Sequence, residues 1–69
     1  MKVKDINFLK IKRKFYVVVF VRDGQELYRV NMFNRTERKI VKTWYGNNDV
    51  QELKFALVNG LPLLYIVLL

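Results

Sequence analysis

The stretch that decides the fold is Lys14–Phe33, which reads Lys-Phe-Tyr-Val-Val-Val-Phe-Val-Arg-Asp-Gly-Gln-Glu-Leu-Tyr-Arg-Val-Asn-Met-Phe. Asp23-Gly24 stands between two β-rich runs, Lys14–Arg22 and Glu26–Phe33. Because a type I′ turn needs positive φ at both central residues, Asp-Gly in this position predicts a hairpin with a two-residue loop. We expect every other element to pack on this ribbon or to extend it.

A two-residue loop also sets the register of the hairpin, with Arg22 opposite Gln25 and Phe20 opposite Leu27. Side chains alternate across a strand, so each face can be assigned from the sequence. The expected core face is almost wholly apolar and carries Phe15, Val17, Val19, Val21, Tyr28, Val30 and Met32. The other face mixes aromatic and basic residues: Tyr16, Val18, Phe20, Leu27, Arg29, Asn31 and Phe33. A slip of one residue would exchange the two faces.

The composition bounds both the size and the chemistry of the protein. Its 69 residues predict a single domain, residues 1–69. The chain has no cysteine and no histidine, which removes the commonest general base and the commonest metal ligands. We therefore expect no enzyme, no cofactor and no metal. The lack of cysteine fits a reducing compartment, which predicts a cytoplasmic protein.

The net charge of +7 is distributed unevenly along the chain. Residues 1–42 hold twelve of the thirteen Lys and Arg residues and four acids, which gives +8. Residues 43–69 hold one Lys and two acids, which gives −1. The basic half, residues 1–42, suggests a polyanionic partner, although charge also serves solubility.

Three further segments complete the predicted architecture. Residues Phe8–Lys12 are interpreted as extended, with a helix from Asp5 to Lys10 as the alternative. After a turn at 34–37, the β-formers of Arg38–Tyr45 predict a third strand. A loop with an even number of residues before this strand would bring Lys42 and Trp44 onto the mixed face beside Arg29. A loop with an odd number would place them on the core face instead.

A helix is predicted from Asp49 to Val58, because Asn48 with Gln51 resembles a capping box. Its apolar stripe, Val50, Leu53 and Leu57, would meet the core face of the hairpin. Asn59-Gly60 would end the helix, and the apolar run Leu63–Leu69 predicts a buried closing strand. That run is too short to span a bilayer, so we expect no membrane association.

The expected fold class is therefore α+β: an antiparallel sheet of three to four strands with one helix packed on one face, in the order (β)βββαβ. The helix between the last two strands would allow a right-handed crossover. Phe55, Val58 and the closing run are more apolar than one short helix can cover, which predicts a homodimer.

The leading functional hypothesis is a small basic module that binds nucleic acid, DNA more than RNA. Aromatic side chains on a sheet can stack bases, while Lys and Arg neutralise phosphates. The candidate residues are an N-terminal cluster and a sheet set: Lys10, Lys12, Arg13, Lys14, Arg29, Arg38, Lys42 and Trp44. The alternative is that the mixed face packs against the N-terminal segment or a second subunit.

Two loose resemblances bear on this hypothesis. The element order and the stretch Ile40-Val41-Lys42-Thr43 resemble the core of restriction-endonuclease-like nucleases and Holliday-junction resolvases. Ile40 occupies the position of their metal-binding Glu, which argues against nuclease activity. The stretch Trp44-Tyr45-Gly46-Asn47-Asn48 resembles the strand-to-helix junction of sheet domains by which some phage and transposon integrases and related plant transcription factors read DNA.

A protein-binding role is the rival hypothesis. The apolar face or a sheet edge would then hold a protein partner. The richness in Lys, Asn, Ile, Tyr and Phe is compatible with a small regulatory protein of viral or phage type.

Overall fold

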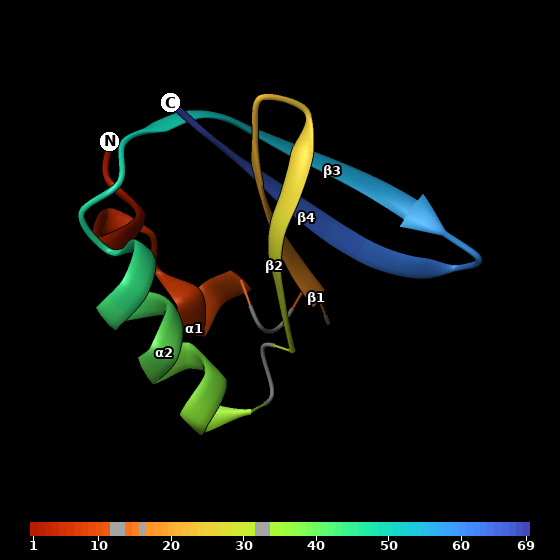
Figure 1. Ribbon diagram of the computed structural model, residues 1–69. Coiled ribbons are helices and arrows are strands. Elements are labelled where there is room, and N and C mark those ends of the chain that lie inside the picture. Colours follow the sequence, from red (N-terminus) through yellow and green to blue (C-terminus); the bar gives the residue numbers. More distant parts are fainter. Residues whose placement is uncertain (12–13, 16, 32–33) are drawn as a thin grey trace.

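The protein is an α+β structure with one four-stranded sheet and one main helix, as the sequence predicts (Figure 1). The computed structural model describes residues 1–11, 14–15, 17–31 and 34–69. Two short helical segments precede the sheet, and the main helix lies between two hairpins. In chain order the elements are η1 (Val3–Asp5), α1 (Phe8–Ile11), β1 (Val17–Arg22), β2 (Gln25–Asn31), α2 (Arg35–Tyr45), β3 (Val50–Val58) and β4 (Leu61–Leu68).

The sheet is mixed, which corrects the prediction of an antiparallel sheet in the order (β)βββαβ. The strand order is β2-β1-β4-β3. The outer pairs are antiparallel hairpins, whereas β1 and β4 pair in parallel at the centre, with Val18 beside Leu64 and Phe20 beside Ile66. The predicted closing strand is confirmed as β4, and Leu63, Leu64, Ile66 and Leu68 are buried in it.

The predicted hairpin at Asp23-Gly24 is confirmed, and both turn residues have positive φ, 53° and 75°. Its register is corrected by a β-bulge. Arg22 pairs with Gln25 as expected, but Phe20 pairs with Tyr28, because Leu27 is an extra residue on β2.

The bulge exchanges the faces of β1 relative to the predicted assignment. Val18 and Phe20 are fully buried in the core with Val30, while Val17, Val19 and Val21 lie on the opposite face. Tyr28 and Val30 are on the core face as predicted. Tyr16, Met32 and Phe33 lie outside the described residues.

The predicted third strand, Arg38–Tyr45, is wrong, because this segment belongs to α2. The supposed turn before it is the start of the helix. The Asn34 side chain caps the helix by accepting hydrogen bonds from the backbone N–H groups of Thr36 (3.0 Å) and Glu37 (3.2 Å). The apolar residues Val41 and Tyr45 then recur at helical spacing and face the sheet. The nuclease-like and integrase-like resemblances lose the strand on which they depended.

The predicted helix from Asp49 to Val58 is also wrong, because this segment is β3. Asn59-Gly60 makes a second two-residue turn of the same kind as Asp23-Gly24, with φ of 52° and 79°. A helix C-terminus and a type I′ turn both use positive φ at Asn-Gly, so the local signal was ambiguous. Of the predicted helical stripe, Leu53 and Leu57 lie exposed on the strand, whereas Val50 packs against the core and is partly buried.

The N-terminal segment is helical rather than extended over most of its described length. Residues Phe8–Ile11 form α1, whose first turn is capped by the Asn7 side chain through the N–H groups of Leu9 and Lys10. The predicted alternative, a helix from Asp5 to Lys10, is closer to the structure but begins too early, because α1 begins at Phe8.

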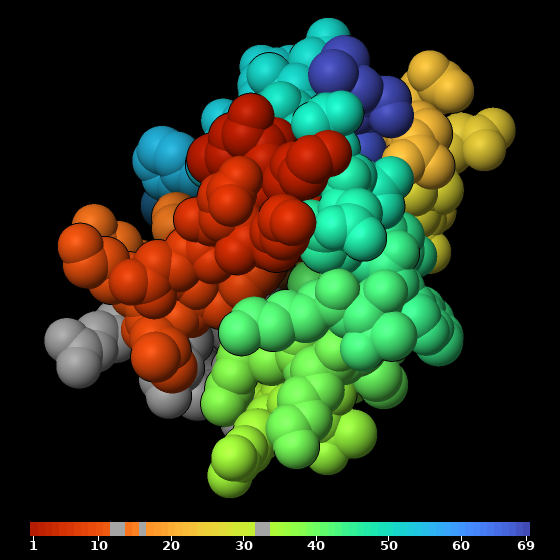
Figure 2. Space-filling view, turned by 90° about the vertical axis from the view of Figure 1, so that its left-hand side faces the viewer, coloured from red at the N-terminus to blue at the C-terminus, as the bar shows by residue number. Residues whose placement is uncertain are grey.

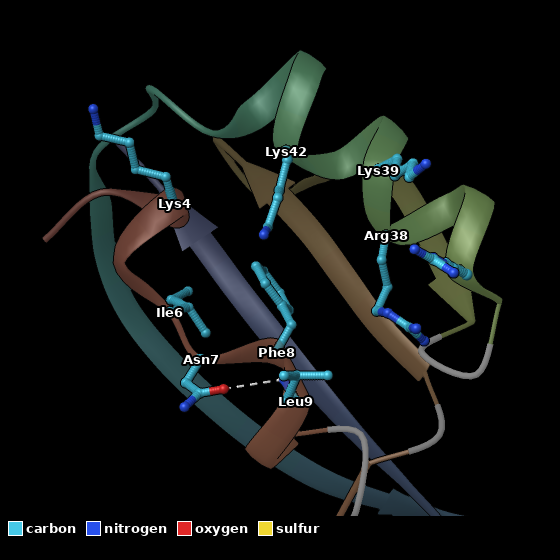
Figure 3. A pocket seen from close by; sticks show the side chains of 9 residues that line it. Lys4, Ile6, Asn7, Phe8, Leu9, Arg38, Lys39 and Lys42 are labelled. Atoms are coloured by element: carbon cyan, nitrogen blue, oxygen red, sulfur yellow. Dashed lines mark hydrogen bonds between the residues drawn. The ribbon is translucent and has the colours of Figure 1, made fainter.

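The core lies between the sheet and a layer made of α2 and the N-terminal helical segments, which occupy the same side (Figures 1 and 3). The Phe20 ring stacks on Tyr45 at 4.8 Å between centroids, and Tyr28 packs beside both Tyr45 and Trp44. Val3 and Phe8 contribute the buried side chains from the N-terminal side. The outer part of the β3–β4 hairpin extends beyond this layer (Figure 1).

The corrected register can be tested with Phe20→Ala. Because Phe20 is fully buried and stacked on Tyr45, its truncation is expected to cost about 3–5 kcal/mol of unfolding free energy. That is comparable with the whole stability expected of a chain of this size. Urea unfolding followed by circular dichroism measures the change.

Leu27→Ala is the control, because Leu27 lies exposed at the bulge. It is expected to change stability by no more than about 0.5 kcal/mol. Equal costs for the two variants would contradict the register.

Candidate nucleic-acid interface

A basic cleft lies between α2 and the N-terminal segments η1 and α1 (Figure 3). Its volume is about 360 Å³. Figure 2 shows the two segments that form it, the N-terminal segment and α2, side by side on one face of the molecule. Five cations and four other residues line it: Lys4, Arg35, Arg38, Lys39, Lys42, Ile6, Asn7, Phe8 and Leu9. None of these described lining residues is acidic, so the cleft is strongly electropositive.

Four of the five cations come from one face of α2. Arg35, Arg38, Lys39 and Lys42 follow the spacing i, i+3, i+4 and i+7, which places them in one row along the helix. The Arg38 and Lys42 side chains extend toward α1, with Phe8 between the two elements (Figure 3). Lys4 is the fifth cation and comes from η1.

Backbone hydrogen bonds hold the N-terminal wall of the cleft beside the end of α2. Val3 N–H donates to the Asn48 carbonyl (3.0 Å), and Lys4 N–H donates to the Gly46 carbonyl (2.9 Å). Ile6 and Phe8 belong to the same wall, and their almost fully buried side chains pack it against the core. The two walls are therefore held at a defined separation by main-chain bonds and packing rather than by flexible side chains.

Part of the cation row is unfavourable for the helix that carries it. Pairs of like charge at i, i+4, such as Arg35–Lys39 and Arg38–Lys42, each destabilise a helix by about 0.2–0.5 kcal/mol. Arg35 also lies at the helix N-terminus, where the helix dipole favours negative charge, whereas Lys42 in the last turn suits the dipole. Arg and Lys are good helix formers, and an anion in the cleft would relieve the repulsion within the row.

The structure brings together only two of the predicted site residues in this cleft, Arg38 and Lys42. Lys10 and Lys14 line a neighbouring hollow with Ile11 and Phe15, at the other end of α1. The remaining members of the predicted cluster, Lys12 and Arg13, lie outside the described residues.

Arg29 and Trp44 lie away from the cleft, which corrects the predicted grouping with Lys42. Arg29 pairs with Val19, so it lies on the sheet face opposite the core face that α2 covers. There Arg29 forms an ion pair with Glu26, with 2.8 Å between nitrogen and oxygen. Residues three apart on a strand ordinarily point to opposite faces, but the bulge at Leu27 brings both side chains to this face. Trp44 follows Lys42 by two residues, so the two side chains point about 160° apart around the helix axis. The Trp44 ring packs edge-on against Tyr28.

Sequence reasoning missed three of the five cleft cations, Lys4, Arg35 and Lys39. The signal that could have found two of them is the i, i+3, i+4, i+7 spacing of cations that begins directly after Asn34. It becomes visible once Asn34 is recognised as a helix cap rather than a turn residue. Lys4 reaches the cleft through tertiary structure alone.

The chain matches no known family model, no curated protein and no solved structure. Within the described residues, His, Cys, Asp and Glu side chains form no group of three or more that could hold a metal ion. None of the helices in the described part of the chain is long and apolar enough to cross a membrane.

The contact between Glu26 and Arg29 can be tested by titrating the Glu26 carboxyl group. A hydrogen bond from Arg29, together with its positive charge, lowers the pKa of Glu26, and the same bond raises the pKa of Arg29. A lowered folded-state pKa means that the pair stabilises the fold above the unfolded pKa of Glu, about 4.3, and that this contribution is lost as the pH falls through the folded-state pKa.

In Arg29→Gln, the pKa of Glu26 is expected to rise toward its ordinary value, as followed by the NMR shift of its side-chain carboxyl carbon. Lys54→Gln is the control, because Lys54 pairs with Glu52 instead. A Glu26 pKa that stays unchanged in Arg29→Gln would show that the pair does not form in solution.

Proposed function

We propose that this protein binds nucleic acid through the basic cleft between α2 and the N-terminal segment. The observation that carries the proposal is the convergence of five cations from two separate parts of the chain, without an acid among the described lining residues. Phosphate groups are the anions that such a cleft would neutralise, and counterion release would supply much of the affinity. We place this activity in the cytoplasm, in keeping with a chain that has no cysteine.

The cleft favours contacts to the sugar–phosphate backbone over contacts to bases. Lys and Arg contacts to phosphates position a protein but carry no sequence information directly. A base-stacking platform is not supported, because Phe20 is buried and Trp44 lies away from the cleft. We therefore infer binding with little sequence preference.

The preference for DNA over RNA stays the prediction made from the sequence. The four cations of α2 line the cleft and face the N-terminal segment, so the helix does not insert this face into a groove. We propose that the row follows the phosphates of a strand lying at the cleft, and both DNA and RNA carry such phosphates.

The salt dependence of DNA binding tests the proposal. If all five cleft cations contact phosphates, the logarithm of the association constant should fall with the logarithm of salt concentration with a slope of about −4.5. Fluorescence anisotropy with a labelled duplex of arbitrary sequence measures the slope. The absence of salt-dependent binding to duplex DNA, single-stranded DNA and RNA alike would overturn the proposal.

Matched arginine substitutions locate the binding surface. Arg35→Gln removes a cleft cation and is expected to weaken binding and to make the salt slope shallower by about 0.9. Arg29→Gln makes the same chemical change on the opposite side of the sheet and is expected to leave the slope unchanged. A comparable effect of the two substitutions would show that net charge, rather than the cleft, is responsible.

A further inference from the structure

The outer part of the β3–β4 hairpin exposes large apolar side chains on a projecting ribbon (Figure 1). On the helical side of β3, Phe55 is 71%, Leu57 69% and Leu53 44% exposed. Val58 and Leu61 are exposed on the other side. Exposed apolar residues that are contiguous in this way mark an interaction surface.

The same ribbon forms an outer edge of the sheet. Only its start pairs with the N-terminus, where the Val50 N–H donates to the Met1 carbonyl (2.8 Å) and Lys2 forms a β-bridge with Asp49. β3 is an outer strand, and its pairing with β4 is regular from Leu53 to Val58, after a bulge near its start. The other outer strand, β2, carries the bulge at Leu27 and the Glu26–Arg29 ion pair, features that hinder the addition of another strand. Of the two edges, β3 is the one open to strand addition.

The charge distribution is compatible with a second copy of this chain at this edge. A second copy of this chain also carries +7, so an approach between two basic halves is repulsive. The near-neutral half, residues 43–69, carries −1 and contains both β3 and β4. Two copies can therefore meet at β3 while their basic surfaces stay apart.

We propose that two copies of the chain associate through antiparallel pairing of their β3 strands, with Phe55 opposite Phe55 of the second copy. When a two-fold axis relates two antiparallel strands, the residue numbers of every opposing pair add up to the same value. With Phe55 on the axis, that value is 110. This register sets Leu53 opposite Leu57 of the second copy, and Lys54 opposite Ala56. The three exposed apolar residues of each strand then form one continuous ladder on the helical side.

Registers shifted toward the start of β3 fit less well. A pair centred on Lys54 would set two lysines against each other. A pair centred on Leu53 would match Glu52 with Lys54 of the second copy, but would leave Phe55 opposite Gln51. Exposed ion pairs contribute little beside the burial of large apolar side chains, and Glu52 and Lys54 already pair within one strand at 3.3 Å.

Antiparallel pairing has a two-fold axis perpendicular to the sheet, so the helical layers of both copies lie on the same side of an eight-stranded sheet. The two basic clefts would then face the same side and could contact one nucleic acid together. This consequence rests on the proposed function, whereas the β3 pairing does not.

Engineered cysteines test the pairing directly, because the chain contains no cysteine of its own. Only the residue on the two-fold axis lies opposite itself, at a Cα separation of about 4.5–5.5 Å that a disulfide can bridge. Phe55→Cys is therefore expected to form a covalent dimer on mild oxidation, and Leu53→Cys and Leu57→Cys to form much less. Non-reducing gels measure the fraction that is cross-linked.

Leu27→Cys is the matched control on the other edge strand and is expected to stay uncross-linked. Preferential cross-linking at Leu53 would overturn the register, and equal cross-linking at Leu27 would overturn the interface. Light scattering of the unmodified chain should return twice 8.3 kDa. A mass of one chain at concentrations up to the millimolar range would overturn the dimer.

A charge substitution separates loss of pairing from loss of folding. Phe55→Lys is expected to return the protein to a single-chain mass with an unchanged circular dichroism spectrum, because Phe55 is 71% exposed and loses only a peripheral contact with the Phe15 ring, at 6.1 Å between centroids. Leu27→Lys adds the same charge at the other edge and should leave the mass doubled. A doubled mass in Phe55→Lys would overturn the proposal. Since neither measurement involves nucleic acid, a negative result here is distinct from failure of the proposed function.

Discussion

The parallel pairing of β1 with β4 is the interaction on which the rest of this structure depends. Each strand already belongs to an antiparallel hairpin, and an isolated two-stranded hairpin is marginally stable at best in water. The central pairing joins the two hairpins into one sheet and places Phe20 beside Ile66 in the core. Parallel strands need a long connection, and here β2, α2 and β3 lie between the two partners in sequence.

This arrangement separates the molecule into two chemically different parts. α2 and the N-terminal segment cover the core face near β1 and β2, and main-chain bonds to Gly46 and Asn48 hold their walls together as the basic cleft. The β3–β4 hairpin extends beyond that cover and exposes apolar side chains. The charge asymmetry of the sequence thus becomes a spatial separation between a basic cleft and a near-neutral sheet edge.

The sequence-based predictions succeeded where a short signal had one meaning and failed where it had two. Asp23-Gly24 between β-rich runs indicates a turn, and the apolar run Leu63–Leu69 indicates a buried strand, of which Leu63, Leu64, Ile66 and Leu68 are buried. Asn59-Gly60 suits a helix end and a hairpin equally, and Val50–Val58 has apolar residues at both periods. Of the candidate site, Arg38 and Lys42 were predicted, but they were placed on a strand because Asn34 was interpreted as a turn residue.

By itself, the sequence determined the fold class, the first hairpin, the apolar closing strand and the basic character of residues 1–42. These follow from local turn chemistry, hydrophobicity and composition, which need no knowledge of distant residues. Only the tertiary structure decided which face of β1 is buried, since one extra residue at Leu27 reverses the side-chain alternation. It alone also brought Lys4 to the row of cations on α2, because backbone bonds across more than forty residues of chain position that wall.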